Sequence, residues 1–243
     1  MKIGCCIAKS QIEGWPILDR FDFIEAKFSD IVELSDSFRK LHVYALNNLF
    51  RRDKNIFDQK LSKTFKAIDH IFKLVEKHKI GFLTLGSGGA RKFLSHHSVK
   101  VNIEKWIKIL TYIEHKAETT HSEVGIEPLG NFETNFLNTI PEVAFYIDQL
   151  KLKKVGITAD TFHFFDSDAS LKGLERHVEK IKHIHISSDE RKFPTAISKR
   201  NKQFLDIIKK SSFDKNISIE IDWRETLEND PNIIYLLKKF FHD

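Results

Sequence analysis

Three carboxylates and one imidazole lie near the ends of four short apolar segments in the second half of the chain. They are Glu127 in GIEPL, Asp160 in TADTFH, His185 in HIHIS and Glu220 in SIEID. If the fold brings these side chains together, the carboxylates repel and desolvate one another unless a cation neutralises them. Oxygen-rich ligation with one nitrogen and no thiolate suits Mn²⁺, Mg²⁺ or Co²⁺ better than a structural zinc. Each residue taken alone has a plainer explanation, since a strand-end acid can cap the next helix and a histidine in such a run is often a core residue.

The elements that must position these residues are short apolar segments that recur along the chain. They are rich in Ile, Val and Phe, and longer stretches with helical periodicity separate them. Eight are found, at residues 2–8, 21–27, 41–49, 81–87, 123–129, 155–163, 181–187 and 217–223. One of the amphipathic stretches between them is 60–78, in which one helical face carries Leu61, Phe65, Ile68, Ile71, Phe72 and Val75.

Strand and helix that alternate through the whole chain predict a parallel sheet, because parallel neighbours need a helical connection. Eight such units fit a closed (β/α)8 TIM barrel, an α/β fold, as a single domain over 1–243, while an open doubly wound sheet remains the alternative from counting alone. In such a barrel we expect an apolar strand interior and an active site at the carboxyl ends of the strands. The acid Glu220, set in an otherwise apolar strand, is therefore expected to belong to a site.

Composition limits the class of protein. The chain of 243 residues is 41% hydrophobic and 30% charged, which is typical of a soluble globular protein, and no apolar run reaches the roughly 18 to 20 residues of a membrane helix. The N-terminus lacks the long apolar core and cleavage site of a signal peptide. The two cysteines, Cys5 and Cys6, are adjacent and cannot form an ordinary intrachain disulfide. We therefore expect a cytoplasmic protein without a membrane partner. The net charge of +5 is scattered along the chain, which disfavours a dedicated nucleic-acid surface.

Several runs of the sequence resemble one enzyme family. They are VGIEPLGNFETNFLNT at 124–139, ITADTFHFF at 157–165, IKHIHISSDERKFP at 181–194, ISIEIDW at 217–223, the loop LGSGGARK at 85–92 and FDFIEAKFSDI at 21–31. Together they are similar to the sugar isomerase/epimerase family with the xylose isomerase-like barrel, which contains ketose 3-epimerases and hydroxypyruvate isomerases and has endonuclease IV as a relative. The resemblance spans essentially the whole chain and is specific for the family rather than for a substrate. It implies a xylose isomerase-like TIM barrel that acts on a small carbohydrate.

The resemblance also implies roles for individual residues. The four residues named first would hold one divalent metal ion, and Glu127 and Glu220 would also act as an acid/base pair on opposite faces of the substrate. His163, Arg191 and Glu133 match substrate-contacting positions. In such chemistry the metal stabilises an enediolate while a carboxylate removes a proton next to a carbonyl. Return of the proton to the opposite face of the same carbon gives epimerisation, and return to the neighbouring carbon gives aldose–ketose isomerisation. As plainer alternatives, His163 braces a neighbouring acid and Arg191 is an exposed loop charge.

Basic residues gather on loops that we expect to surround the barrel mouth. They are Arg51, Arg52, Lys54, Arg91, Lys92, Arg191 and Lys192. This pattern predicts an anionic substrate such as a sugar acid or sugar phosphate, with the lysine-rich composition as the competing explanation. The glycine-rich loop 85–92 could present N–H groups to an anion, but it lacks the spacing of a nucleotide P-loop, and a plain tight turn explains it equally well.

Other functions remain open. A dehydratase would use the same metal and enediolate but expel a hydroxyl, and a non-catalytic member would bind a sugar or a partner protein. Endonuclease IV activity is disfavoured, because that reaction needs a three-metal cluster with extra histidines and no Asp-x-His pair follows His185. The loops NNLFRRD and RKFPTAISKRNKQF depart from the family pattern, which leaves the substrate open. Relatives often form dimers or tetramers, and the aromatic-rich tail 232–243 could pack on its own barrel or on a neighbouring subunit.

Overall fold

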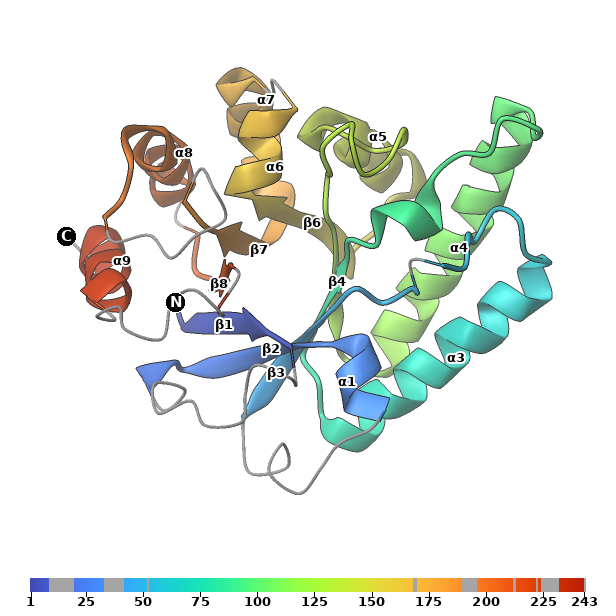
Figure 1. Ribbon diagram of the computed structural model, residues 1–243, viewed down its shortest axis with the longest axis horizontal. Helices are drawn as coiled ribbons and strands as arrows, with labels where there is room; N and C mark the ends of the chain where they lie inside the picture. The colour runs from blue at the N-terminus through green and yellow to red at the C-terminus, as the bar shows by residue number, and fades with distance from the viewer. Residues whose placement is uncertain are drawn as a thin grey trace.

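A closed barrel of eight parallel strands forms the centre of the molecule (Figure 1). The computed structural model describes residues 1–8, 20–32, 42–51, 53–167, 170–188, 196–211, 213–221, 223 and 232–242. Each strand pairs in parallel with its neighbours in sequence, and β1 closes the barrel against β8. The strands are β1 (Ile3–Ile7), β2 (Phe23–Lys27), β3 (Val43–Asn47), β4 (Phe82–Leu85), β5 (Glu123–Ile126), β6 (Val155–Asp160), β7 (Ile181–Ile186) and β8 (Asn216–Glu220).

Helices follow most strands and cover the outside of the barrel (Figure 1). They are α1 (Phe28–Val32), α3 (Leu61–His78), α4 (Val99–Thr119), α5 (Ile140–Leu150), α6 (Thr161–Asp166), α7 (Leu171–Arg176), α8 (Lys199–Lys210) and α9 (Asn232–His242), with short 3-10 turns η3 (Gly88–Arg91) and η4 (Val178–Lys180). In α3 the buried residues include Ile68, Phe72 and Val75, whose spacing places them on one face. A capping box of Thr139 and Glu142 begins α5, because each side chain satisfies a backbone N–H at the helix start.

The predicted barrel is confirmed, and each of the eight predicted segments contains one strand. Five segments match their strands within two residues at each end, namely 2–8, 21–27, 41–49, 81–87 and 181–187. The sixth segment was expected to run to residue 163, but β6 ends at Asp160. The difference has a local cause, since the Asp160 carboxylate accepts hydrogen bonds from the N–H groups of Phe162 and His163 and so begins α6.

The expectation of an apolar barrel interior is wrong. Polar side chains from five strands are fully or almost fully buried at the barrel centre, namely Glu25, Thr84, Thr158, His183, His185 and Ser218. Hydrogen bonds connect them, as between Thr84 Oγ1 and Glu25 (3.0 Å) and between His183 Nε2 and Ser218 Oγ (3.0 Å). Buried polar groups are stable only when they are hydrogen-bonded in this way. The apolar core instead lies mainly between the strands and the outer helices.

The C-terminal helix packs on the chain's own barrel. In α9 the side chains of Ile233 and Leu237 are fully buried, and Lys209 Nζ of α8 donates a hydrogen bond to the carbonyl of Phe240 (2.7 Å). This contact answers the question of what the apolar tail covers. The oligomeric state stays a prediction. Among the described helices, none is both long and apolar enough to span a bilayer.

Candidate active site

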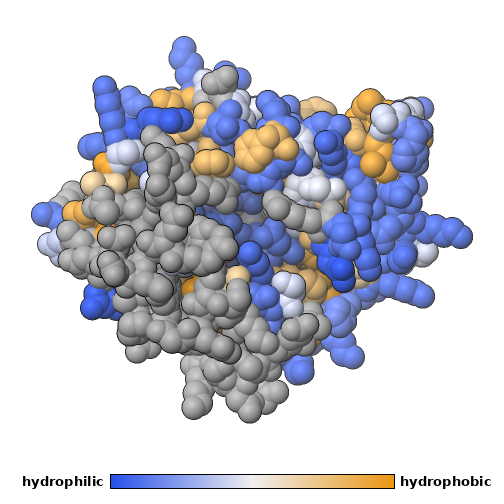
Figure 2. Space-filling view, in the orientation of Figure 1, coloured by the Kyte–Doolittle hydropathy of each residue, from blue (hydrophilic) through white to orange (hydrophobic). Residues whose placement is uncertain are grey.

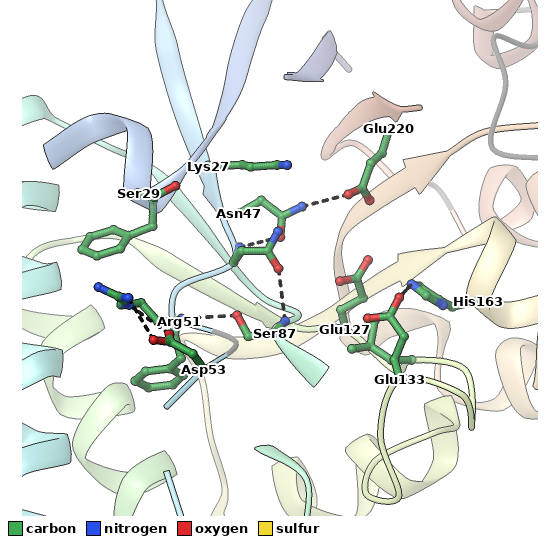
Figure 3. Close-up of a pocket in the computed structure, with 14 residues that line it drawn as sticks. Lys27, Ser29, Asn47, Arg51, Asp53, Ser87, Glu127, Glu133, His163 and Glu220 are labelled. Atoms are coloured by element: carbon green, nitrogen blue, oxygen red, sulfur yellow. Dashed lines mark hydrogen bonds and ion pairs between the residues drawn. The ribbon is translucent and has the colours of Figure 1, made fainter. Parts of the chain in front are cut away.

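A cavity of about 750 Å³ opens at the carboxyl ends of the strands (Figure 3). Its lining includes the carboxylates Glu127, Glu133 and Glu220 and the imidazole of His163, together with Lys27, Phe28, Ser29, Asn47, Asn48, Phe50, Arg51, Asp53, Ser87 and Leu129. A volume of this size is typical of a pocket for a small molecule. In the space-filling view, hydrophilic side chains cover much of the described surface, with smaller apolar patches between them (Figure 2).

The four predicted metal ligands lie together. Glu127, Asp160, His185 and Glu220 each offer one ligand atom, and these atoms lie within 4.8 Å of one another. His185 is at the centre of the group, because its Nδ1 atom is 3.0 Å from Glu127 Oε1, 2.9 Å from Glu220 Oε2 and 4.0 Å from Asp160 Oδ2. The four side chains come from the ends of β5, β6, β7 and β8 or the residue that follows, as the sequence predicts.

Asp160 divides its two carboxylate oxygens between two tasks. Oδ1 accepts hydrogen bonds from the N–H groups of Phe162 (2.6 Å) and His163 (3.2 Å) at the start of α6. The other oxygen, Oδ2, faces His185. The helix-capping explanation weighed for this residue is therefore confirmed, and the same carboxylate also lies in the cluster, while its role as a metal ligand stays a prediction.

Glu220 is held by a residue that the sequence did not single out. Asn47, the last residue of β3, donates a hydrogen bond from Nδ2 to Glu220 Oε1 (3.1 Å), as Figure 3 shows. The Asn47 amide is itself oriented, because its Oδ1 accepts from the N–H of Asn48 (2.6 Å). This arrangement turns the second oxygen, Oε2, toward His185.

The glycine-rich loop makes room for Glu127. A Cβ atom at Gly86 would lie 2.4 Å from Glu127 Oε2, closer than nonbonded atoms can approach. The loop therefore brings backbone close to a side chain of the cluster. Ser87, next in the chain, has a left-handed backbone (φ 42°) from which the turn of η3 begins.

The buried side chain of Arg91 holds this loop in place through hydrogen bonds. Its guanidinium is fully buried and donates hydrogen bonds to the carbonyls of Gly86 (2.9 Å), Phe136 (2.6 Å) and Glu127 (2.5 Å). Burial lowers the pKa of Arg91 to about 10, so the group stays charged at neutral pH. The prediction that Arg91 belongs to a basic rim is therefore wrong, because its side chain is directed into the protein where the carbonyls satisfy it.

The electrostatics of the cluster follow from burial and from neighbouring charges. Burial raises the pKa of Glu127, and the nearby carboxylates Glu220 and Asp160 add to this, although His185 opposes it. Burial alone would lower the pKa of His185, but the surrounding carboxylates, Glu25 and Glu220 foremost, raise it well above its usual value. The metal-free cluster thus stabilises a proton on an imidazole surrounded by acids.

The donor set of the cluster fits a divalent cation. Three carboxylates and one imidazole offer hard oxygen ligands with one nitrogen, and they converge on one point that His185 Nδ1 faces. A cation there would replace the proton and relieve the repulsion between the acids. No cysteine thiol takes part, since Cys5 and Cys6 are buried and burial raises the pKa of each.

His163 and Glu133, predicted to contact substrate, lie side by side on the cavity wall (Figure 3). His163 Nδ1 accepts a hydrogen bond from the N–H of Gly130 (3.2 Å), so the ring proton of the neutral form is on Nε2. That Nε2 atom is 3.8 Å from Glu133 Oε1. The pair can therefore offer one donor and one acceptor to a ligand in the cavity.

The predicted basic rim is only partly described. Arg191, the third predicted substrate-contacting residue, lies outside the described residues, as do Arg52 and Lys192. Arg51 lines the cavity and forms a bidentate pair with Asp53, while Lys54 and Lys92 are exposed. A further cation, Lys27 at the end of β2, also lines the cavity and was not predicted (Figure 3).

Sequence reasoning also missed two residues beneath the cluster. Glu25 of β2 and His183 of β7 are fully buried and joined by a hydrogen bond of 2.9 Å between Oε2 and Nε2. The signal that could have found Glu25 is the one used for Glu220, an acid inside an apolar strand. His183 precedes the predicted ligand His185 by two residues, so both rings point into the barrel.

The chain is similar in sequence or in structure to proteins that include two named as 4-epimerases. A 3-dehydro-D-guloside 4-epimerase of Escherichia coli is 29% identical over 86 residues, which are 35% of this chain and about a third (33%) of that enzyme. The apo structure of a 3-keto-D-glucoside 4-epimerase from E. coli superposes with a TM-score of 0.77 at 19% identity, covering 100% of this chain and 99% of that one. The protein IolI, solved with a bound zinc atom, superposes with a TM-score of 0.69 at 17% identity, covering 98% of this chain and 96% of its own.

These structural likenesses support the fold, and the sequence itself identifies the family. The family model described as xylose isomerase-like TIM barrel matches residues 8–239, nearly the whole chain. The match includes all four residues of the cluster and every strand except β1. This chain belongs to the xylose isomerase-like TIM barrel family.

Proposed function

We propose that this protein is a divalent-metal-dependent epimerase or isomerase of a small sugar that carries a keto group. The observation that carries the proposal is the cluster of Glu127, Asp160, His185 and Glu220, whose ligand atoms lie within 4.8 Å of one another beside a cavity of about 750 Å³. The relatives support the choice of substrate. Two of them are named as 4-epimerases of 3-keto or 3-dehydro sugars, in which the carbon that changes configuration is next to the carbonyl.

Glu127 and Glu220 are the proposed acid/base pair. They extend from β5 and from the end of β8, and both reach the point that His185 Nδ1 faces. One carboxylate removes the proton next to the carbonyl and the other returns a proton from the opposite side, which inverts the carbon. The raised pKa of Glu127 suits this exchange, because a carboxylate made more basic by burial accepts a proton more readily.

The same four residues would hold the metal ion, with Mn²⁺, Mg²⁺ or Co²⁺ as the proposed metals. When bound, the ion supplies Lewis-acid stabilisation of the negative charge that develops on the substrate oxygens. Asn47 keeps Glu220 in place, and the helix-capping hydrogen bonds keep Asp160 in place. These contacts fix the ligands before substrate arrives, which limits the reorganisation that binding requires.

His163 and Glu133 are proposed to bind the substrate hydroxyl or carbonyl groups. The ring orientation of His163, set by the N–H of Gly130, directs its Nε2 proton toward Glu133 and the cavity. Arg191 stays a proposal from the sequence alone. A substrate with an acidic group is also proposed, because Lys27 and Arg51 line the cavity. If so, activity on sugar acids or sugar phosphates falls with added salt and activity on neutral sugars does not.

The proposal is tested by hydrogen exchange in D₂O. Chelator-treated protein is reloaded with Mn²⁺, and a panel of keto sugars, sugar acids and their phosphates is incubated, passed over a chelating resin and analysed by NMR. We expect metal-dependent deuterium incorporation next to the carbonyl and its loss in Glu220→Gln. Gln keeps the size of the side chain but can neither accept nor return a proton. Release of water with formation of a new carbonyl would instead show a dehydratase. Tight binding of sugars without exchange at any carbon would favour a binding protein.

A further inference from the structure

A fully buried carboxylate lies directly beneath the proposed metal ligands. Glu25, in the middle of β2, has 0% of its surface exposed. Its oxygens are 3.0 and 3.1 Å from His185 Nε2, 2.9 Å from His183 Nε2 and 3.0 Å from Thr84 Oγ1. Taking a carboxylate out of water is costly, so a fold retains one only where several donors compensate it.

The chemistry of Glu25 dictates where its partners carry their protons. An ionised carboxylate can only accept hydrogen bonds, so each of its partners must donate. The two Glu25 oxygens face three groups that can donate, His185 Nε2, His183 Nε2 and Thr84 Oγ1, which is the set of partners that an ionised carboxylate requires. His185 therefore carries a proton on Nε2, and its other nitrogen, Nδ1, is the atom that faces Glu127 and Glu220.

We propose that Glu25 is a positioning residue that holds the His185 ring and its Nε2 proton in place, so that the Nδ1 lone pair is presented to the divalent metal ion. The inference rests on the proposed metal site and goes beyond it, because Glu25 touches neither metal nor substrate. Histidines that bind metal commonly donate their second ring proton to a carboxylate, which fixes the tautomer and makes the ligand more basic. Here Glu25 supplies that carboxylate from across the barrel, since β2 is five strands away from β7 in sequence order and three in the closed ring.

His183 makes the arrangement sensitive to a change at Glu25. Its Nε2 atom lies within hydrogen-bond distance of both Glu25 and Ser218, whereas its Nδ1 atom is buried without a hydrogen-bond partner in the described part of the chain. Moving the His183 proton to Nδ1 would bury a donor without an acceptor, which is unfavourable. If a side chain at position 25 donates a hydrogen bond, His185 is therefore the histidine expected to accept it on Nε2, with its proton then on Nδ1.

Glu25→Gln is the variant that uses this property. Gln keeps the volume but replaces one accepting oxygen by an NH₂ group. Because His185 Nε2 lies 3.0 and 3.1 Å from the two Glu25 oxygens, that NH₂ group faces His185 Nε2 in either orientation, and the contact is favourable only if this nitrogen carries no proton. If His185 accepts that hydrogen bond, its remaining proton moves to Nδ1 and blocks the metal. Thr84→Val is the matched control, because it removes one hydrogen bond to Glu25 while the carboxylate and its bonds to both histidines remain.

The measurement is Mn²⁺ affinity of the metal-free protein by titration calorimetry. We expect Glu25→Gln to bind Mn²⁺ about 10 to 100 times more weakly than the unsubstituted protein, and Thr84→Val to stay within about threefold of it. The shift of the unfolding temperature that Mn²⁺ produces should shrink in Glu25→Gln. A role limited to folding would instead lower the unfolding temperature of both metal-free and Mn²⁺-loaded protein by the same amount, with unchanged affinity, and that result would overturn the inference.

A second measurement needs no substitution and covers the case in which Glu25→Gln does not fold. In the protein loaded with diamagnetic Zn²⁺, imidazole ¹⁵N spectra should show His185 with its proton on Nε2 and its metal bond on Nδ1. The opposite assignment would refute the role of Glu25. If the unsubstituted protein binds neither ion, the proposed metal site itself fails. If it binds normally and only the Glu25 results disagree, the inference fails alone.

Discussion

Removing the charge of Glu127 should make the metal-free protein more stable while it destroys the proposed function. The ligand oxygens of Glu127, Asp160 and Glu220 lie within 4.8 Å of one another, and at an effective dielectric constant of about 20 each pair of like charges at that distance costs about 3.5 kcal/mol. Glu127 takes part in two such repulsions. Its attraction to the His185 imidazolium at 3.0 Å contributes about 5.5 kcal/mol on the same scale, so the two repulsions exceed it. The raised pKa of Glu127 likewise indicates that its surroundings disfavour the negative charge.

We therefore expect Glu127→Gln to raise the free energy of unfolding by about 1 to 2 kcal/mol in chelator at pH 7, measured by urea denaturation. The matched control is Glu123→Gln, the same substitution at the other end of β5. Glu123 pairs with Lys182 Nζ at 2.5 Å in a partly exposed position, and its loss should lower stability by about 1 kcal/mol or less. With Mn²⁺ present the order should reverse, because only the unsubstituted protein gains stability from the ion. A metal-free Glu127→Gln protein that is less stable by 1 kcal/mol or more would refute the electrostatic reasoning.

Three further predictions follow from single contacts. Gly86→Ala places a Cβ atom 2.4 Å from Glu127 Oε2. We expect at least a tenfold loss of Mn²⁺ affinity by calorimetry and a loss of about 1 to 3 kcal/mol in the free energy of unfolding. Unchanged affinity would contradict the packing described for this loop. Arg91→Met leaves buried carbonyls without donors and should lower the free energy of unfolding by about 3 kcal/mol or more in urea, whereas a change below about 1 kcal/mol would show that water replaces the guanidinium. The raised pKa of His185 means that its stabilising charge in the metal-free protein is fully present below the unfolded value of about 6.5 and is lost as the pH rises through the higher folded value. Since Mn²⁺ must displace the Nδ1 proton, its apparent affinity should rise with pH by up to about tenfold per pH unit for each proton released. Calorimetry in buffers of different ionisation enthalpy measures how many protons are released. An affinity that does not depend on pH, without proton release, would be the contrary result.

The part of the fold that could be predicted is the part that shows a local periodic pattern of apolar residues. Strands such as β7 and β8 are short apolar runs between polar segments, and each ends near a residue able to bind metal, so four strand ends were enough to predict the cluster. In a parallel barrel all carboxyl ends of the strands lie at one face, so residues at the strand ends come close together although they are far apart in the sequence. Neither step requires knowledge of distant contacts.

What could not be predicted depends on contacts between distant segments. Asn47 and Glu220 are 173 residues apart, and nothing local to either residue indicates their hydrogen bond. Arg91 looks like a solvent-exposed loop charge in the sequence, yet carbonyls from two loops converge on it and draw it inside. Glu25 has the same local signal as Glu220, because both are acids in apolar strands. The two differ in position, since Glu25 lies halfway along β2 and Glu220 lies at the end of its strand, where it reaches the cavity.

The most direct test of the account is the stoichiometry and residue dependence of metal binding. Chelator-treated protein is titrated with Mn²⁺ by calorimetry, alongside Glu127→Gln, Asp160→Asn, His185→Gln and Glu220→Gln, with Glu133→Gln as a control that lines the same cavity outside the cluster. The account predicts one Mn²⁺ per chain, a loss of affinity of at least tenfold in each of the four ligand variants and nearly unchanged affinity in the control. Absence of Mn²⁺, Mg²⁺ and Co²⁺ binding by the unsubstituted protein, or binding that survives all four substitutions, would contradict it.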